Sequence, residues 1–205
     1  RKQLSNLVVR CLILKHTEEN SKIVAQGKYQ DEVDYLVSSK SRQNFIRNLA
    51  LKLEGNTLCL FQLVEKHGQN LYDIIKDKAD TKRKVFYIFG GVEADEREAI
   101  RGIVEKEKDA IIVASYGTFS TGVNIKNLHN IIFASPSKSR IRNLQSIGRG
   151  LRLGDNKVNA TLYDIADDIT YKSKENFTLK HFQERINIYT EEEFDYEIHN
   201  VDLKE

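Results

Sequence analysis

The chain has 205 residues, which is room for one ordinary domain with a real core, or for two small domains at most. Apolar residues make up 40% of it and charged residues 30%, a balance that is typical of a folded globular chain and excludes a disordered one. The 32 basic side chains nearly cancel the 30 acidic ones, so the net charge of +2 by itself identifies no partner.

Six short apolar runs alternate with segments of helical periodicity along the chain. Several runs are nearly continuous in Val, Ile, Leu and Phe, as in strands that are buried on both faces of a parallel sheet. The runs cover residues 7–14, 57–64, 85–89, 110–115, 130–134 and 158–165, and the helical segments cover residues 42–53, 70–78, 93–106, 139–151 and 174–194. This alternation predicts a three-layer α/β domain, with a parallel sheet of about six strands flanked by helices.

The sequence shows no internal linker before about Thr170. We therefore expect one domain over residues 1–170, followed over residues 171–205 by a C-terminal helix and an acidic tail that pack on it. Residues 191–205 carry seven Asp or Glu and one Lys, and we expect this tail to stay solvated. The chain begins with Arg1 and contains no methionine, which suggests a segment of a longer protein.

No apolar run is long enough to span a bilayer and no signal-like segment lies near the start of the chain, so we expect a cytoplasmic protein. Cys11 and Cys59 lie inside apolar runs and lack the spacing of zinc ligands. They are therefore predicted to be buried thiols, and no metal site is expected from the cysteines, histidines or carboxylates.

Candidate functional residues follow the predicted strands, because in an open α/β sheet the chemistry lies in loops beyond the carboxyl ends of strands. Gly90 and Gly91 follow one strand and could present backbone N–H groups to a phosphate, although a glycine pair is also ordinary turn chemistry. Residues 115–124 combine hydroxyl side chains with two glycines, a composition able to approach a sugar-phosphate backbone closely. A generic polar loop is the alternative for this second segment.

The most specific pattern lies on the predicted helix over residues 139–151 and just beyond it. Gln145, Arg149 and Arg152 are spaced i, i+4 and i+7 and so share one helix face. Gly148 lies in the adjacent apolar stripe, where a glycine costs about 1 kcal/mol against alanine and permits a close approach of a neighbouring element. Two guanidiniums beside an amide suit a polyphosphate, because arginine binds anionic oxygens in a fork and glutamine can orient a water.

These residues resemble a known family. The sequence Q-S-I-G-R-G-L-R over residues 145–152 resembles motif VI, Q-x-x-G-R-x-x-R, of superfamily 2 helicases. Residues 115–124 resemble their motif V, and residues 57–62 their motif IV strand. The sequence I-V-A-S-Y-G-T-F-S-T-G over residues 112–122 is similar to phage helicases of recombination and branch migration. The resemblance covers about residues 7–168 and implies the second, C-terminal RecA-like motor domain of an ATP-dependent DNA helicase.

In such helicases ATP with Mg²⁺ is bound between two RecA-like domains, mainly by an N-terminal domain that this sequence does not contain. The resemblance implies that Arg152 is the arginine finger, that Arg149 is a second γ-phosphate contact, and that Gln145 positions the attacking water. It also implies that Gly122 and Asn124 couple the nucleotide to DNA, although many relatives carry Asp where this chain has Asn124.

The same resemblance implies a track for DNA, bound through its phosphates without sequence preference and in a salt-dependent way. The residues expected to face the DNA are Gln62, Lys66, His67, Gly90, Gly91, Ser115, Tyr116, Gly117 and Thr118.

Half of an ATP site is absent from the sequence, because no G-x-x-x-x-G-K-[ST] phosphate loop occurs in it. The sequence D-E-V-D over residues 31–34 mimics a Mg²⁺-binding box, but the polar residues before it favour acidic side chains at a helix N-terminus. We therefore expect the isolated chain to hydrolyse no ATP. A non-catalytic nucleic-acid-binding or scaffold module with the same fold is the main alternative, and a dinucleotide binder is disfavoured because G-x-G-x-x-G is missing.

Overall fold

The computed structural model describes residues 7–62, 67–90, 93–116, 127–135 and 160–204 of the chain. Within these ranges the strands form one sheet in the order β3-β4-β2-β5-β6-β1-β7, and every strand pair is parallel. The strands are β1 (Leu7–Lys15), β2 (Thr57–Phe61), β3 (Val85–Ile88), β4 (Ile111–Ser115), β5 (Asn130–Phe133), β6 (Ala160–Asp168) and β7 (Asp195–Asp202). All six predicted runs are therefore strands, and the three-layer α/β prediction is confirmed.

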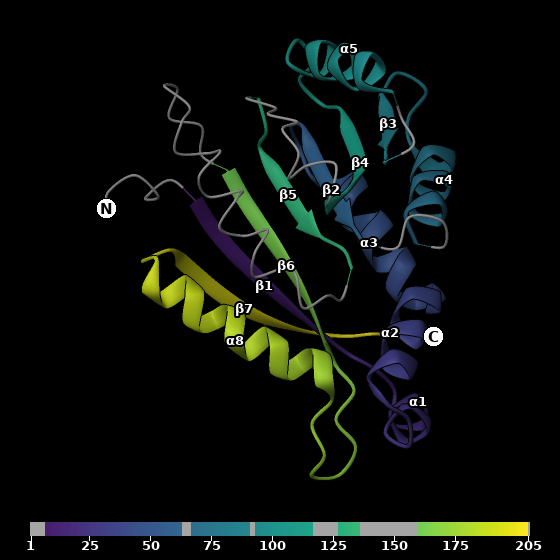
Figure 1. Cartoon of the computed structure of the whole chain (residues 1–205), viewed down its shortest axis with the longest axis vertical. Coiled ribbons are helices and arrows are strands. Elements are labelled where there is room, and N and C mark those ends of the chain that lie inside the picture. Colours follow the sequence, from purple (N-terminus) through teal and green to yellow (C-terminus); the bar gives the residue numbers. More distant parts are fainter. Residues whose placement is uncertain (1–6, 63–66, 91–92, 117–126, 136–159, 205) are drawn as a thin grey trace.

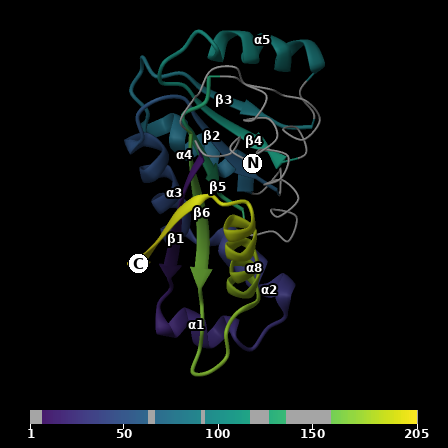
Figure 2. The ribbon, with the colours of Figure 1, turned by 90° about the vertical axis from the view of Figure 1, so that its left-hand side faces the viewer.

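Helices cover both faces of this sheet (Figures 1 and 2). They are α1 (Glu18–Val24), α2 (Tyr29–Ser38), α3 (Lys40–Lys52), α4 (Gln69–Lys78), α5 (Ala94–Val104) and α8 (Phe177–Glu191). Figure 2 shows α8 on one side of the strands and α3 and α4 on the other. Within the described ranges no helix combines the length and apolar character needed to cross a bilayer.

Two apolar cores result, one on each face, because successive side chains of a strand point to opposite sides. Leu58 and Leu60 of β2 join a core with Phe182 of α8. Cys59 and Phe61 of the same strand join a second core, to which α3 and α4 contribute. All five residues of β2 are buried, so the continuous apolar run predicted a strand covered on both faces correctly.

The two thiols are buried, as predicted. Cys11 and Cys59 are both fully buried and neither forms a disulfide. Burial raises the pKa of Cys59 to about 12, so its thiol stays protonated at neutral pH and behaves as a small apolar side chain.

Helices α1 and α2 were missed by the periodicity analysis, but their first turns carry recognisable start signals. The hydroxyl of Thr17 accepts a hydrogen bond from the backbone N–H of Asn20 at 3.3 Å, which caps α1. In the first turn of α2, the carboxylate of Asp31 accepts from the backbone N–H of Lys28 at 2.7 Å. The D-E-V-D sequence therefore lies at a helix N-terminus, as favoured above, and does not follow a strand.

The side chains of the acidic tail are mostly solvated, as expected, but the sequence did not predict that the tail forms a strand. The predicted terminal helix is α8, but the chain then turns at Glu193, whose φ is +58°, and continues as strand β7. Strand β7 pairs in parallel with β1 from Val8↔Asp195 to Lys15↔Asp202 and becomes the edge of the sheet. Most of its side chains are exposed, so backbone hydrogen bonds rather than apolar burial define it, and hydropathy gave no signal for it.

Candidate functional site

The predicted site lies only partly within the described ranges. Outside them are Lys66, Gly91, Gly117, Thr118, Gly122, Asn124, Gln145, Arg149 and Arg152. The structure therefore describes the remaining predicted residues, which are Gln62, His67, Gly90, Ser115 and Tyr116, and the strands and helices around them.

The described members of the predicted site follow neighbouring strands at the carboxyl edge of the sheet. Gln62 follows β2 and Gly90 lies two residues beyond β3, while Ser115 ends β4 between them in the sheet. Gln62 and Gly90 are exposed, whereas Ser115 at 6% and Tyr116 at 5% have little accessible surface. His67 has none. The topology thus brings the predicted residues to one edge, and the contact of each with DNA stays a prediction.

Ser135, which the sequence analysis missed, connects two parts of this edge. Its hydroxyl accepts a hydrogen bond from the backbone N–H of Gln62 at 2.8 Å and lies 2.6 Å from Nδ1 of His67. Ser135 comes two residues after β5, the strand next to β2, and is itself buried. The only sequence signal for it was a small polar residue directly after an apolar run.

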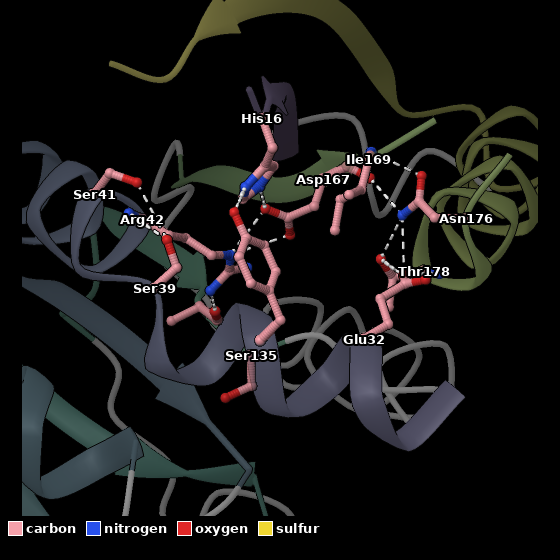
Figure 3. A network of polar contacts seen from close by, with 12 residues as sticks. His16, Glu32, Ser39, Ser41, Arg42, Ser135, Asp167, Ile169, Asn176 and Thr178 are labelled. Carbon is pink, nitrogen blue, oxygen red and sulfur yellow. Dashed lines mark hydrogen bonds and ion pairs between the residues drawn. The ribbon is translucent and has the colours of Figure 1, made fainter. Parts of the chain in front are cut away.

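A buried charged cluster joins three further elements at the same edge (Figure 3). One carboxylate oxygen of Asp167, near the end of β6, lies 2.8 Å from Nε2 of His16, which directly follows β1. Nε of Arg42, in the first turn of α3, donates to both carboxylate oxygens at 2.9 and 3.1 Å. Nη1 of Arg42 then donates to the backbone carbonyl of Ala134, directly after β5, at 2.7 Å. The partners in this cluster are up to 151 residues apart in sequence.

The electrostatics of the cluster favour an ionised carboxylate. Burial by itself raises the pKa of Asp167, but the adjacent Arg42 guanidinium and the hydrogen bond from His16 outweigh it and hold the pKa well below its usual range. The cluster is thus a buried ion pair whose charges are matched. Nη2 of Arg42 nevertheless has no hydrogen-bond partner among the described residues, and an unsatisfied buried donor costs about 1–3 kcal/mol.

A second buried arginine–aspartate pair lies on the opposite face of the sheet. Nε and Nη2 of Arg185, in α8, donate to the two carboxylate oxygens of Asp164, in β6, at 2.7 and 2.8 Å. The hydroxyl of Tyr189 also donates to this carboxylate, and burial together with the negative charge of Asp164 raises the pKa of that hydroxyl. The pair joins α8 to the middle of β6, away from the carboxyl edge.

Glu32 supplies a third buried contact, which explains the acidic residues of α2. Its carboxylate accepts from the backbone N–H of Phe177 at 2.9 Å, and from the N–H and hydroxyl of Thr178 at 2.7 and 2.6 Å. It also accepts from the amide of Asn176 at 2.9 Å (Figure 3). Glu32 therefore caps the N-terminus of α8 from another helix, where the helix dipole favours a negative charge.

A family model and two known relatives all identify this chain as similar to helicases. The model of the helicase conserved C-terminal domain matches residues 40–154. The ATP-dependent DNA helicase uvsW of Enterobacteria phage T4 is 35% identical over 98% of this chain and 42% of its own length. The putative ATP-dependent helicase IRC3 of Saccharomyces cerevisiae is 30% identical over 52% of this chain and 15% of its own length. The chain thus spans less than half the length of these relatives.

Solved structures share the fold of this chain. The crystal structure of T4 UvsW matches 97% of this chain and 42% of that chain with a TM-score of 0.86. The C-terminal domain of the DEAD-box protein Dbp5 matches 95% of this chain and 90% of that chain with a TM-score of 0.58, but at 12% identity it shows a shared fold alone.

Proposed function

Because the chain belongs to the helicase conserved C-terminal domain family and has its RecA-like fold, we propose that it is the second motor domain of an ATP-dependent superfamily 2 DNA helicase or translocase. The similarity to a phage ATP-dependent DNA helicase over nearly the whole chain supports this role. From the resemblance of residues 112–122 to phage helicases of recombination and branch migration, we further propose that the parent protein acts in recombination, branch migration or fork repair. The observation that carries the proposal is the Q-x-x-G-R-x-x-R sequence from Gln145 to Arg152 inside the matched range.

The side chains of Gln145, Arg149 and Arg152 carry hydrogen-bond donors that fit a nucleoside triphosphate. One amide and two guanidiniums can bind anionic oxygens and orient a water without any covalent chemistry, which is what phosphoryl transfer requires. In this proposal Arg152 is the arginine finger, Arg149 is a second contact to the γ-phosphate, and Gln145 positions the attacking water. Gly122 and Asn124 couple this site to the nucleic acid. An N-terminal RecA-like domain supplies the phosphate loop and most of the Mg²⁺ contacts.

The DNA track in this proposal runs along the carboxyl edge of the sheet. Gln62 and Gly90 are exposed there and can reach a phosphate directly. Ser115, Tyr116 and His67 lie at the same edge and are buried there, and Lys66, Gly91, Gly117 and Thr118 complete the proposed track. Contacts to phosphates make the binding independent of sequence and weaker at high salt.

DNA-stimulated ATP hydrolysis tests this proposal, measured on the natural polypeptide that carries the chain, with a first motor domain present. Arg152→Ala is expected to lower the rate about 10³-fold or more, because it removes the arginine finger. Arg140→Ala, a matched change outside the motif and close before it, is expected to stay within a few-fold of the wild type. Equal rates for wild type and Arg152→Ala would instead support the scaffold alternative. The 205-residue chain alone is expected to hydrolyse no ATP.

A further inference from the structure

Arg42 holds together the part of the carboxyl edge where β5 ends. Its Nε donates to Asp167 of β6, and its Nη1 donates at 2.7 Å to the carbonyl of Ala134. Asp167 also accepts from His16, and all three side chains are buried, so the guanidinium is held between buried partners. In this arrangement Nη1 faces the carbonyl of Ala134.

The backbone at this point is fixed from several sides. The N–H of Ala134 donates to the carbonyl of Leu60 at 2.9 Å, so Ala134 is bound through its N–H by β2 and through its C=O by Arg42. The next residue, Ser135, accepts from the N–H of Gln62. Arg42 thus makes one of at least four hydrogen bonds that described residues form with Ala134 and Ser135, the last two described residues before the segment that carries Gln145, Arg149 and Arg152.

The arrangement differs from a purely structural ion pair. Arg185 directs both of its bonds at the carboxylate of Asp164, within one helix–strand contact. Arg42 instead divides its donors between a carboxylate and a backbone carbonyl of another strand, and leaves Nη2 without a described partner. Since apolar replacements of buried ion pairs are often more stable, a buried arginine with an unsatisfied donor indicates that position, rather than stability, is what it provides.

We propose that Arg42 is a positioning residue for nucleotide hydrolysis. Held by Asp167 and His16, it fixes the end of β5, from which the chain continues to the catalytic motif that begins at Gln145. This inference rests on the proposed function. A displacement of about 1 Å in a catalytic group can lower a rate by about 100-fold. Loss of the hydrogen bond from Arg42 to the carbonyl of Ala134 should therefore lower kcat.

The test compares Arg42→Lys with Arg185→Lys in the natural polypeptide, with DNA and a first motor domain present. Each change keeps a positive charge beside a buried aspartate and removes the guanidinium fork. Both are expected to lower the melting temperature by similar amounts. Only Arg42→Lys is expected to lower kcat, by about 10- to 100-fold, with the KM for ATP changed less than about 3-fold, because lysine has a single donor nitrogen in place of the Nε and Nη1 that bond Asp167 and Ala134 separately.

Equal kcat values for the two variants would overturn the inference. If Arg42→Lys does not fold, Ser135→Ala serves instead. It leaves the ion pair between Arg42 and Asp167 intact and removes the hydrogen bond between Ser135 and Gln62 at the same edge. A wild-type kcat for Ser135→Ala would then also overturn it. Arg152→Ala separates the two proposals. If Arg152→Ala abolishes hydrolysis while Arg42→Lys behaves like Arg185→Lys, this inference alone fails, and if Arg152→Ala hydrolyses at the wild-type rate, the proposed function fails.

Discussion

The contact between Glu32 and the start of α8 predicts a large loss of stability for one conservative change. Glu32→Gln keeps the size of the side chain but removes its charge and turns one acceptor into a donor. The carboxylate accepts four hydrogen bonds at 2.6–2.9 Å, from Asn176, Phe177 and Thr178. If the glutamine keeps its oxygen towards Thr178, its NH₂ group faces the N–H of Phe177, and that partly buried N–H loses its acceptor.

The size of the effect follows from these contacts. An unsatisfied buried donor costs about 1–3 kcal/mol, and each remaining bond weakens because its acceptor is no longer charged. Together these losses amount to about 3 kcal/mol of unfolding free energy. For a chain of this length that corresponds to a melting temperature lower by about 6–12 °C.

Urea unfolding of the 205-residue chain, followed by circular dichroism, measures this loss. Asp31→Asn is the matched control, because Asp31 lies next to Glu32 but, among the described residues, its carboxylate bonds only the exposed N–H of Lys28. It is expected to change the unfolding free energy by less than about 0.5 kcal/mol. If Glu32→Gln costs no more than Asp31→Asn, then Glu32 does not cap α8 and the reasoning is refuted.

Two further predictions concern the pH dependence of stability and the backbone. The folded-state pKa of Asp167 is depressed by Arg42 and His16, so its contribution to stability is complete above the unfolded-state value near pH 4 and is lost as the pH falls through the folded value. Below about pH 4 the wild type should lose about 1.4 kcal/mol per pH unit more than Asp167→Asn, and equal slopes in urea unfolding would contradict this. Gly55→Ala should cost about 1–3 kcal/mol, because φ is +95° there and a Cβ would lie 2.8 Å from Cβ of His129. Gly102→Ala in α5 should instead raise the unfolding free energy by about 0.4–1 kcal/mol, because no atom outside its own helix backbone lies within 4 Å of the added Cβ. Urea unfolding measures the effect of both glycine substitutions. A Gly55→Ala chain as stable as the wild type would contradict the argument.

The local pattern of the chain determined six of the seven described strands, β1 to β6, and the class of fold. The run from Thr57 to Phe61 is buried at every residue. A short, continuous apolar run of this kind is typical of a strand in a sheet covered on both faces. The sequence also identified the family, because the spacing of Gln145, Arg149 and Arg152 is specific in itself. Helix α2 was missed although Val33, Leu36 and Val37 have helical spacing and are buried, and only its acidic first turn was recognised.

Only the tertiary structure decided which polar groups meet. The partners Arg42 and Asp167 are 125 residues apart, and Glu32 lies 146 residues from Thr178. Strand β7 exists because β1 offers it backbone hydrogen bonds, and its own side chains stay mostly exposed. Periodicity along a sequence reports which side of an element is apolar, whereas the partner of a buried charge or of an edge strand is chosen by the order of strands in the sheet, which no local pattern contains.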